Sequence, residues 1–136
     1  MHAAALGLAR TVTWLGERDD QLAVLRSADI GWVVASGDDA AWAYLDFMAL
    51  RVPVVAERGE QAQHYLADGI AGILLSPGDI PATAATLATF LAHDEQRLAM
   101  GNAGRIRVTR AFPASAMIDG FEQAASVARE RSAWQR

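Results

Sequence analysis

The sequence predicts an α/β fold built on a parallel sheet of about four short strands. Short apolar, β-branched runs alternate with segments of helical spacing, and Gly, Pro and Asp mark the boundaries between them. The last third of the chain shows helical spacing only. Alternation of this kind indicates parallel strands joined by right-handed crossovers, with helices on both faces of the sheet. We therefore expect one partial, Rossmann-like, three-layer domain over residues 1–136, ending in a helical tail over 81–133.

The four strands are expected near residues 11–15, 30–35, 52–56 and 72–75. The first, "TVTWL", is β-branched and aromatic and stops at Gly16. The second, "IGWVVA", is a continuous apolar run, as expected for a strand buried on both faces. The third can begin with Pro53, because the first position of a strand needs no ladder N–H. The fourth is "GILL".

Helices are expected between and after these strands. Asp19 or Asp20 can cap the first, in which Leu22, Leu25 and Ala28 recur at helical spacing. The later helices are expected over 40–51, over "EQAQHYLADG" up to a Gly stop, and over 81–92, 95–110 and 114–133. In the tail, Asp79 and Asp94 are candidate caps and Pro113 can open the last helix.

Composition excludes several functions. The net charge of −4 argues against non-specific nucleic-acid binding. Every basic residue is Arg, so no Lys can form a Schiff base or bind phosphate. Cysteine is absent and no apolar run approaches the roughly 20 residues of a membrane span, so we expect a cytoplasmic protein. The His residues show no ligand spacing, and we expect neither a metal site nor a cofactor.

A series of motifs runs through the chain in a fixed order. They are "WLG" (14–16), "AD" (28–29), "DFMALRVPVVA" (46–56), "DGIAG" (68–72), "ILLSPGD" (73–79) and "RLAMGNAGR" (97–105). Their order resembles the C-terminal, nucleotide-sugar-binding domain of the GT-B-fold retaining glycosyltransferases called group 1, or family four. The resemblance covers nearly the whole chain, and it implies a Rossmann-like domain that receives a sugar donor.

In that family, two glutamates eight residues apart bracket the helix that receives the donor, and Asp38 and Asp46 stand at their positions here. The resemblance implies that Asp38 contacts the sugar and Asp46 holds the ribose hydroxyls. Backbone amides near Asp39, Ala40 and Ala41 would meet the diphosphate at the helix N-terminus. The other interpretation is that Asp38 caps the helix and Asp46 is a solvated or hydrogen-bonded side chain.

The departures from the family cluster in the site. Asp replaces Glu at both positions, and Asp39 and Ala41 stand where the family has glycine. Positions at the edge of the site also differ from the family or carry charge. The residues expected there as candidate contacts to the phosphates or to the edge of the donor are Arg51, Arg58, Glu60, Gln61 and His64. Arg51 replaces a family Gly. For His64 and the two arginines, packing or solvation is the competing interpretation, and no residue of this chain is expected to be catalytic.

The resemblance also implies missing upstream parts: two strand–helix units of this domain and the acceptor-binding domain. The run at 11–15 would then be separated from the strand at 30–35 by a gap two strands wide. An exposed apolar edge invites pairing. We therefore expect 11–15 to move beside 30–35, or two chains to complete each other as a homo-oligomer or strand-swapped dimer.

Two functions follow from these observations. The first is the donor-binding part of a retaining glycosyltransferase that takes a UDP-, GDP- or ADP-linked sugar to an unknown acceptor and is inactive as an isolated chain. The second is a degenerate, non-catalytic domain kept for assembly or binding. A receiver or flavodoxin-like module is disfavoured, because a receiver should carry a Lys late in the chain and this chain has none.

Overall fold

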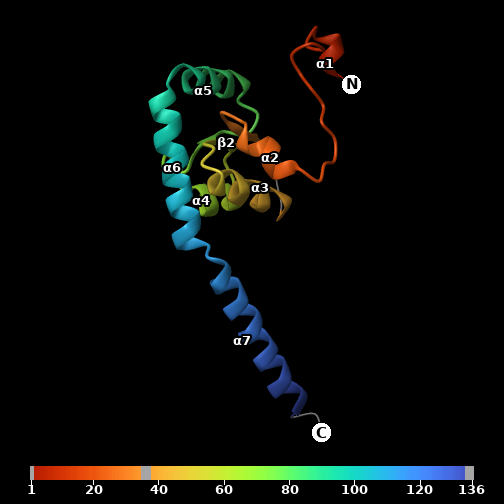
Figure 1. Cartoon of the computed structure of the whole chain (residues 1–136), viewed down its shortest axis with the longest axis vertical. Helices are drawn as coiled ribbons and strands as arrows, with labels where there is room; N and C mark the ends of the chain where they lie inside the picture. Colours follow the sequence, from red (N-terminus) through yellow and green to blue (C-terminus); the bar gives the residue numbers. More distant parts are fainter. Residues whose placement is uncertain (1, 35–37, 134–136) are drawn as a thin grey trace.

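A computed structural model describes residues 2–34 and 38–133 and has the α/β architecture expected from the sequence (Figure 1). The strands are β1 (Gly31–Val33), β2 (Val54–Glu57) and β3 (Gly72–Leu75). The helices are α1 (His2–Ala5), α2 (Gln21–Arg26), α3 (Asp38–Ala49), α4 (Glu60–Leu66), α5 (Ile80–Ala92), α6 (Asp94–Ala111) and α7 (Ala114–Ala133).

The three strands form a parallel sheet in the order β1-β2-β3. Trp32 pairs with Val55, and Val55 with Ile73, so these three side chains share one face. The alternate residues face α3 and α4: Val54 and Leu74 are buried there, and a Cβ on Gly31 would lie 2.7 Å from the Phe47 ring of α3. Helix α5 lies on the opposite face, so helices cover both sides of the sheet as predicted.

The predicted strand at 11–15 does not form. Residues 12–16 make no ladder with any described strand and run outside the body of the molecule (Figure 1). Trp14 is 83% exposed. A β-prone run becomes a strand only where a neighbour supplies its hydrogen bonds, and no described strand lies beside this one. Among the described residues the sheet therefore has three strands rather than about four, and the expected pairing of 11–15 with β1 of the same chain is wrong.

Helix α3 is the centre of the core. Met48, Leu66 and Val54 are completely or almost completely buried around it. Tyr44 packs its ring against Tyr65 of α4, and burial raises the pKa of the Tyr44 phenol. On another side, α6 approaches α3 through Gly101 and Gly104, which are both buried.

The helical tail matches its predicted limits within one residue. Asp79 caps α5 by accepting the N–H of Ala82 at 3.0 Å. Asp94, expected as a cap, is instead the first residue of α6 and pairs with Arg97 at 2.8 Å. Helix α4 ends at Leu66, and its C-cap Ala67, with φ 48°, lies two residues before the predicted stop at Gly69. Asp20 occupies the N-cap position of α2, but its carboxylate pairs with Arg18.

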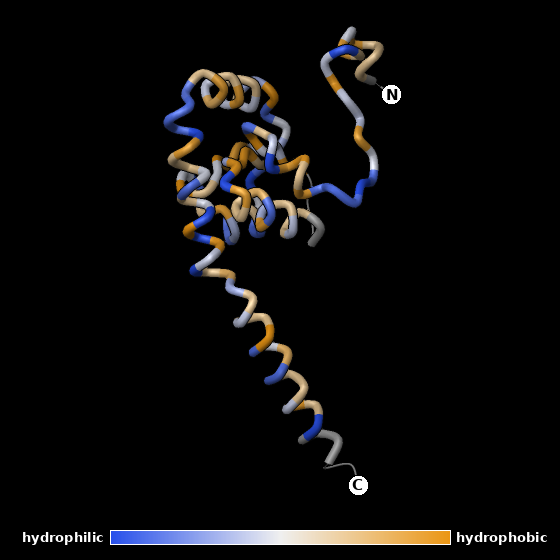
Figure 2. Tube along the Cα trace, viewed as in Figure 1, coloured by the Kyte–Doolittle hydropathy of each residue, from blue (hydrophilic) through white to orange (hydrophobic). Residues whose placement is uncertain are grey.

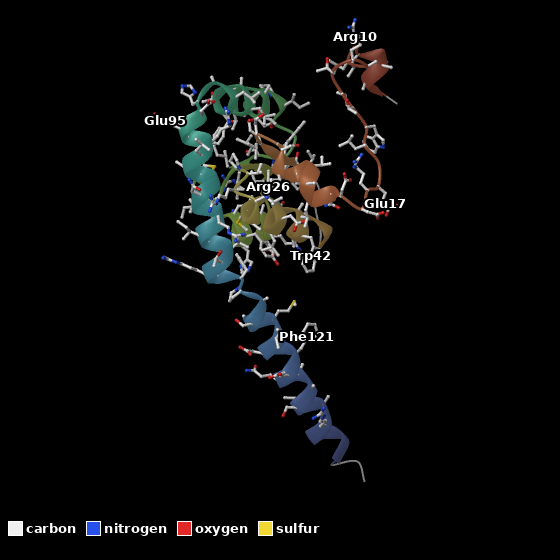
Figure 3. All side chains as sticks on the ribbon, viewed as in Figure 1. Arg10, Glu17, Arg26, Trp42, Glu95 and Phe121 are labelled. Atoms are coloured by element: carbon white, nitrogen blue, oxygen red, sulfur yellow. The ribbon has the colours of Figure 1, made fainter. Side chains whose placement is uncertain are left out.

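Helix α7 leaves the body after Pro113 and runs away from the sheet (Figures 1 and 2). Its apolar side chains, among them Met117, Ile118 and Phe121, are exposed, and Phe121 is seen projecting from the helix in Figure 3. Within residues 2–34 and 38–133, no helix is both long and apolar enough to cross a bilayer.

Candidate functional site

The candidate site lies at the carboxyl edge of the sheet. The three strands are parallel, so they end at the same edge, and α3 and α4 begin just after β1 and β2 end there. In open α/β sheets this edge is where ligands bind. The first-turn amides of a helix have no partner within the helix, and they favour an anion such as a diphosphate.

The N-terminus of α3 carries four of the predicted donor-binding residues. Asp38 and Asp39 are its first two residues, and their side chains lie outside the described part of the chain. Ala40 is buried in the core and Ala41 is half-buried. Ala40, which is only 1% exposed, therefore fixes the start of α3 on the sheet.

Asp46 lies two turns further along α3 and is half-buried. Within residues 2–34 and 38–133, its carboxylate makes no hydrogen bond or ion pair. Burial raises its pKa above the usual range of an aspartate. A partly desolvated carboxylate without a protein partner is the group that a ligand hydroxyl pair can satisfy.

The remaining predicted residues separate into two groups. Glu60 and Gln61 open α4 and therefore lie at the carboxyl edge with the start of α3. His64 is in the last turn of α4, where its ring meets those of Tyr65 and Phe112 edge-on at 5.0 and 5.5 Å. Arg51 lies two residues beyond the last residue of α3 and lines a small hollow with Asp29 and Pro53. The structure thus places His64 and Arg51 at the far ends of their helices.

Arg58 is held by protein groups. Its Nη2 donates to the Asp68 carboxylate at 2.7 Å and to the Leu74 carbonyl at 2.9 Å. Next to it, Glu57 accepts the N–H of Gly78 at 3.0 Å. These two interactions fix the loops after β2 and β3. Sequence reasoning did not find them, because the "DGIAG" motif marks Asp68 without showing which cation it meets.

A mostly apolar hollow of about 560 Å³ lies on the sheet face away from α3. Trp32, Val34 and Val55 form its floor, and Ile80 and Leu87 of α5 form one wall. Trp32 and Val34 are each more than half exposed. Most side chains that line this hollow are apolar, as on a packing surface. Glu57, Asp79 and Thr83 are the polar side chains among them.

Metal binding has no support in the described ranges 2–34 and 38–133. They contain no group of three or more His, Cys, Asp or Glu side chains arranged to hold an ion.

Comparison with known proteins identifies the family. Residues 1–93 match the family described as "Glycosyl transferases group 1". The chain belongs to this family. The matched region includes the whole sheet together with α3, α4 and α5, so the candidate site of this group 1 glycosyltransferase chain lies inside it.

Curated relatives agree with this assignment. The lipopolysaccharide core biosynthesis glycosyltransferase LpsE of Rhizobium meliloti (strain 1021) is 26% identical over 121 residues, covering 89% of this chain and 36% of its own. The D-inositol 3-phosphate glycosyltransferase of Corynebacterium urealyticum (strain ATCC 43042 / DSM 7109) is 31% identical over 100 residues, covering 72% and 24%. The chain therefore spans between a quarter and a little over a third of these relatives.

A solved structure shows the same fold. Sucrose-phosphate synthase from Thermosynechococcus elongatus superposes with a TM-score of 0.76 and 26% identity over 96% of this chain and 33% of its own. The match extends over almost the whole chain, so it takes in the sheet and most of the helical tail. This confirms the GT-B type of fold expected from the motifs.

Proposed function

We propose that this chain is the donor-binding part of a retaining glycosyltransferase, and that a nucleoside diphosphate sugar binds at the carboxyl edge of the sheet. The observation that carries the proposal is Asp46: a half-buried carboxylate on α3, with a raised pKa and without a protein partner among the described residues. Family membership supports it, because the matched residues include α3.

Each part of the donor has a protein group of suitable chemistry. A carboxylate accepts two hydrogen bonds and so fits the vicinal hydroxyls of a ribose, which is the role proposed for Asp46. The first-turn amides of α3, near Asp39 and Ala41, would bind the diphosphate. Asp38 would contact the sugar, and Glu60 and Gln61 would stand at the edge of the site.

The chain contributes binding rather than chemistry in this proposal. The acceptor and the reacting face of the sugar would be held by protein beyond these residues, so the chain alone is expected to bind the donor without transferring its sugar. Sugar release from UDP-, GDP- or ADP-linked glucose, followed in the presence of the pure chain, tests this. Turnover would contradict the division of roles.

The donor proposal is tested first by thermal unfolding with UDP, GDP and ADP. A ligand that binds only the folded state stabilises it by about 2.7 kcal/mol at a concentration of 100 times Kd. We expect one base to raise the melting temperature clearly more than the other two. The base that does so is the one the donor carries.

The alternative function, assembly without donor binding, is favoured by the sheet itself. One edge of β1 has no neighbouring strand within the described residues, and Trp32 and Val34 beside it are more than half exposed. An uncovered apolar edge favours pairing with another chain. We propose that residues 11–15 of one copy pair with β1 of a second copy, giving the homo-oligomer expected from the sequence.

Sedimentation of the wild-type chain and of Val12→Pro tests this pairing. Proline removes a ladder N–H, so the variant should dissociate while keeping its helical content. A wild-type chain that stays monomeric at high concentration would exclude the pairing. The cytoplasmic location expected from the sequence stays a prediction.

A further inference from the structure

Three arginines of α6 bind the C-terminal ends of three different helices. Arg97 donates to the carbonyls of Phe90 and Leu91 at the end of α5, at 2.6 and 2.9 Å. Arg105 Nη1 donates to the carbonyl of Ala49, which is the last residue of α3, at 2.8 Å. Arg107 donates to the last-turn carbonyls of α4.

These contacts fit the chemistry of a helix end. The last four carbonyls of a helix have no partner within it, and the end carries a partial negative charge that favours a cation. Arg107 meets two of these carbonyls, those of His64 and Tyr65, at 2.6 Å each, and its guanidinium also lies over the Phe112 ring at 5.6 Å. Helix α6 is therefore hydrogen-bonded to the C-terminal ends of α3 and α4.

The same end of α3 is also fixed by close packing against α6. A Cβ on Gly101 would clash with the Arg51 carbonyl oxygen, and one on Gly104 would lie 3.3 Å from Met48 Cγ. The last turn of α3 thus rests directly on the backbone of α6. Its first turn is at the carboxyl edge of the sheet, about 18 Å away for a helix of this length.

We propose that Arg105 and Arg107 are positioning residues for the donor site, acting through α3 and α4. The inference rests on the proposed function, because it gives these arginines a task at that site. A helix moves as a rigid rod, so a tilt of about 5° at the Arg105 end moves the Asp38 end by about 1.5 Å. When a distant substitution displaces the groups of a site by about 1 Å, the site can be strongly impaired.

The test compares Arg105→Gln with Arg105→Lys and with Arg110→Gln. Lys keeps the charge and a donor. Arg110 is an exposed arginine of the same helix that makes no hydrogen bond or ion pair within the described residues, so its replacement removes the same charge without the contact. Amide hydrogen exchange is followed separately in the middle of α3 (42–45) and around its C-terminal end (48–51). Nucleotide affinity is measured on the same samples.

We expect Arg105→Gln to speed exchange in 42–45, which lie away from the Arg105 contact at Ala49, and to weaken nucleotide binding about threefold to tenfold. Arg105→Lys should restore much of both, and Arg110→Gln should change neither. Arg107→Gln should act in the same way on the hydrogen-bonded amides of α4, which begin at Gln63.

The two proposals fail in different ways. Faster exchange confined to 48–51, with 42–45 unchanged, makes Arg105 a local cap and overturns the positioning role whatever the nucleotide data. If the wild-type chain binds no nucleotide, the proposed function fails, and exchange at 42–45 still decides whether Arg105 sets the position of α3.

Discussion

The Asp68 carboxylate accepts the backbone N–H of Leu74 at 3.0 Å and so closes the turn between α4 and β3. Its second oxygen accepts Arg58 Nη2 at 2.7 Å, and the same nitrogen donates to the Leu74 carbonyl. One carboxylate therefore links Arg58, which directly follows β2, to Leu74 of β3. The hydrogen bond from Leu74, helped by Arg58, lowers the pKa of Asp68.

Replacing Asp68 by Ala should lower the free energy of unfolding by about 1–2 kcal/mol, because the half-buried N–H of Leu74 loses its acceptor. The folded pKa lies below the unfolded value, so the contribution is complete above about pH 4 and is lost as pH falls through the folded pKa. Urea unfolding at pH 7 and at pH 3 measures this. A gap between wild type and variant that widens at pH 3 would contradict it.

Gly101→Ala should destabilise the protein by about 3 kcal/mol, because the new methyl group meets the backbone of Arg51 rather than a movable side chain. Gly120→Ala is the matched control on α7, where a Cβ meets nothing within 4 Å. There the better helix propensity of Ala should add about 0.8 kcal/mol. Equal effects of the two substitutions in urea unfolding would rule out the close approach of α6 to α3.

Arg51→Gly should stabilise the protein by about 0.5–1 kcal/mol. Arg51 has φ 62°, in the left-handed region where any side chain except glycine is strained, and its side chain is exposed. Arg51→Ala is the control, since Ala keeps the strain. Thermal unfolding that ranks Ala with or above Gly would show that strain is not the cause.

Much of the fold could be predicted because its signals are local. Residues 72–75 and the helix beginning after Pro113 lie where the apolar spacing and the proline place them. The strand predicted at 11–15 does not form, because a strand depends on a neighbouring strand and the sequence pattern does not say whether that neighbour is present. The positive φ of Arg51 suits the glycine that the resemblance implies at this position.

The site was predictable only in part. The helix expected over 40–51 begins two residues earlier, so Asp38 is the first residue of α3 and Asp46 lies within it. The partners of Arg58, Arg105 and Arg107 are residues far along the chain or backbone carbonyls, and these pairings arise from tertiary packing. A lone Arg in a sequence gives no signal for which helix end it will meet.

Asp46→Asn should raise the free energy of unfolding at pH 7 by about 0.5–1 kcal/mol, since it removes a partly desolvated charge that lacks a protein partner in the described ranges. The folded pKa lies above the unfolded value, so the penalty is full above the folded pKa and disappears as pH falls below the unfolded one. Urea unfolding between pH 7 and pH 3 checks whether the two proteins converge. A difference that is independent of pH would mean that the charge of Asp46 is not its source.

The most direct measurement of the central claim is calorimetric binding of UDP, GDP and ADP, each with its 2′-deoxy analogue, to the wild-type chain, Asp46→Ala and the control Asp119→Ala. Asp119 is an exposed aspartate of α7. We predict that one ribonucleotide binds and that Asp46→Ala weakens it by about 1–3 kcal/mol. The 2′-deoxy analogue should lose a similar amount on wild type and little more on Asp46→Ala, and Asp119→Ala should bind as wild type does. Absence of binding at millimolar nucleotide, or equal affinity of wild type and Asp46→Ala, would contradict a donor site at this carboxylate.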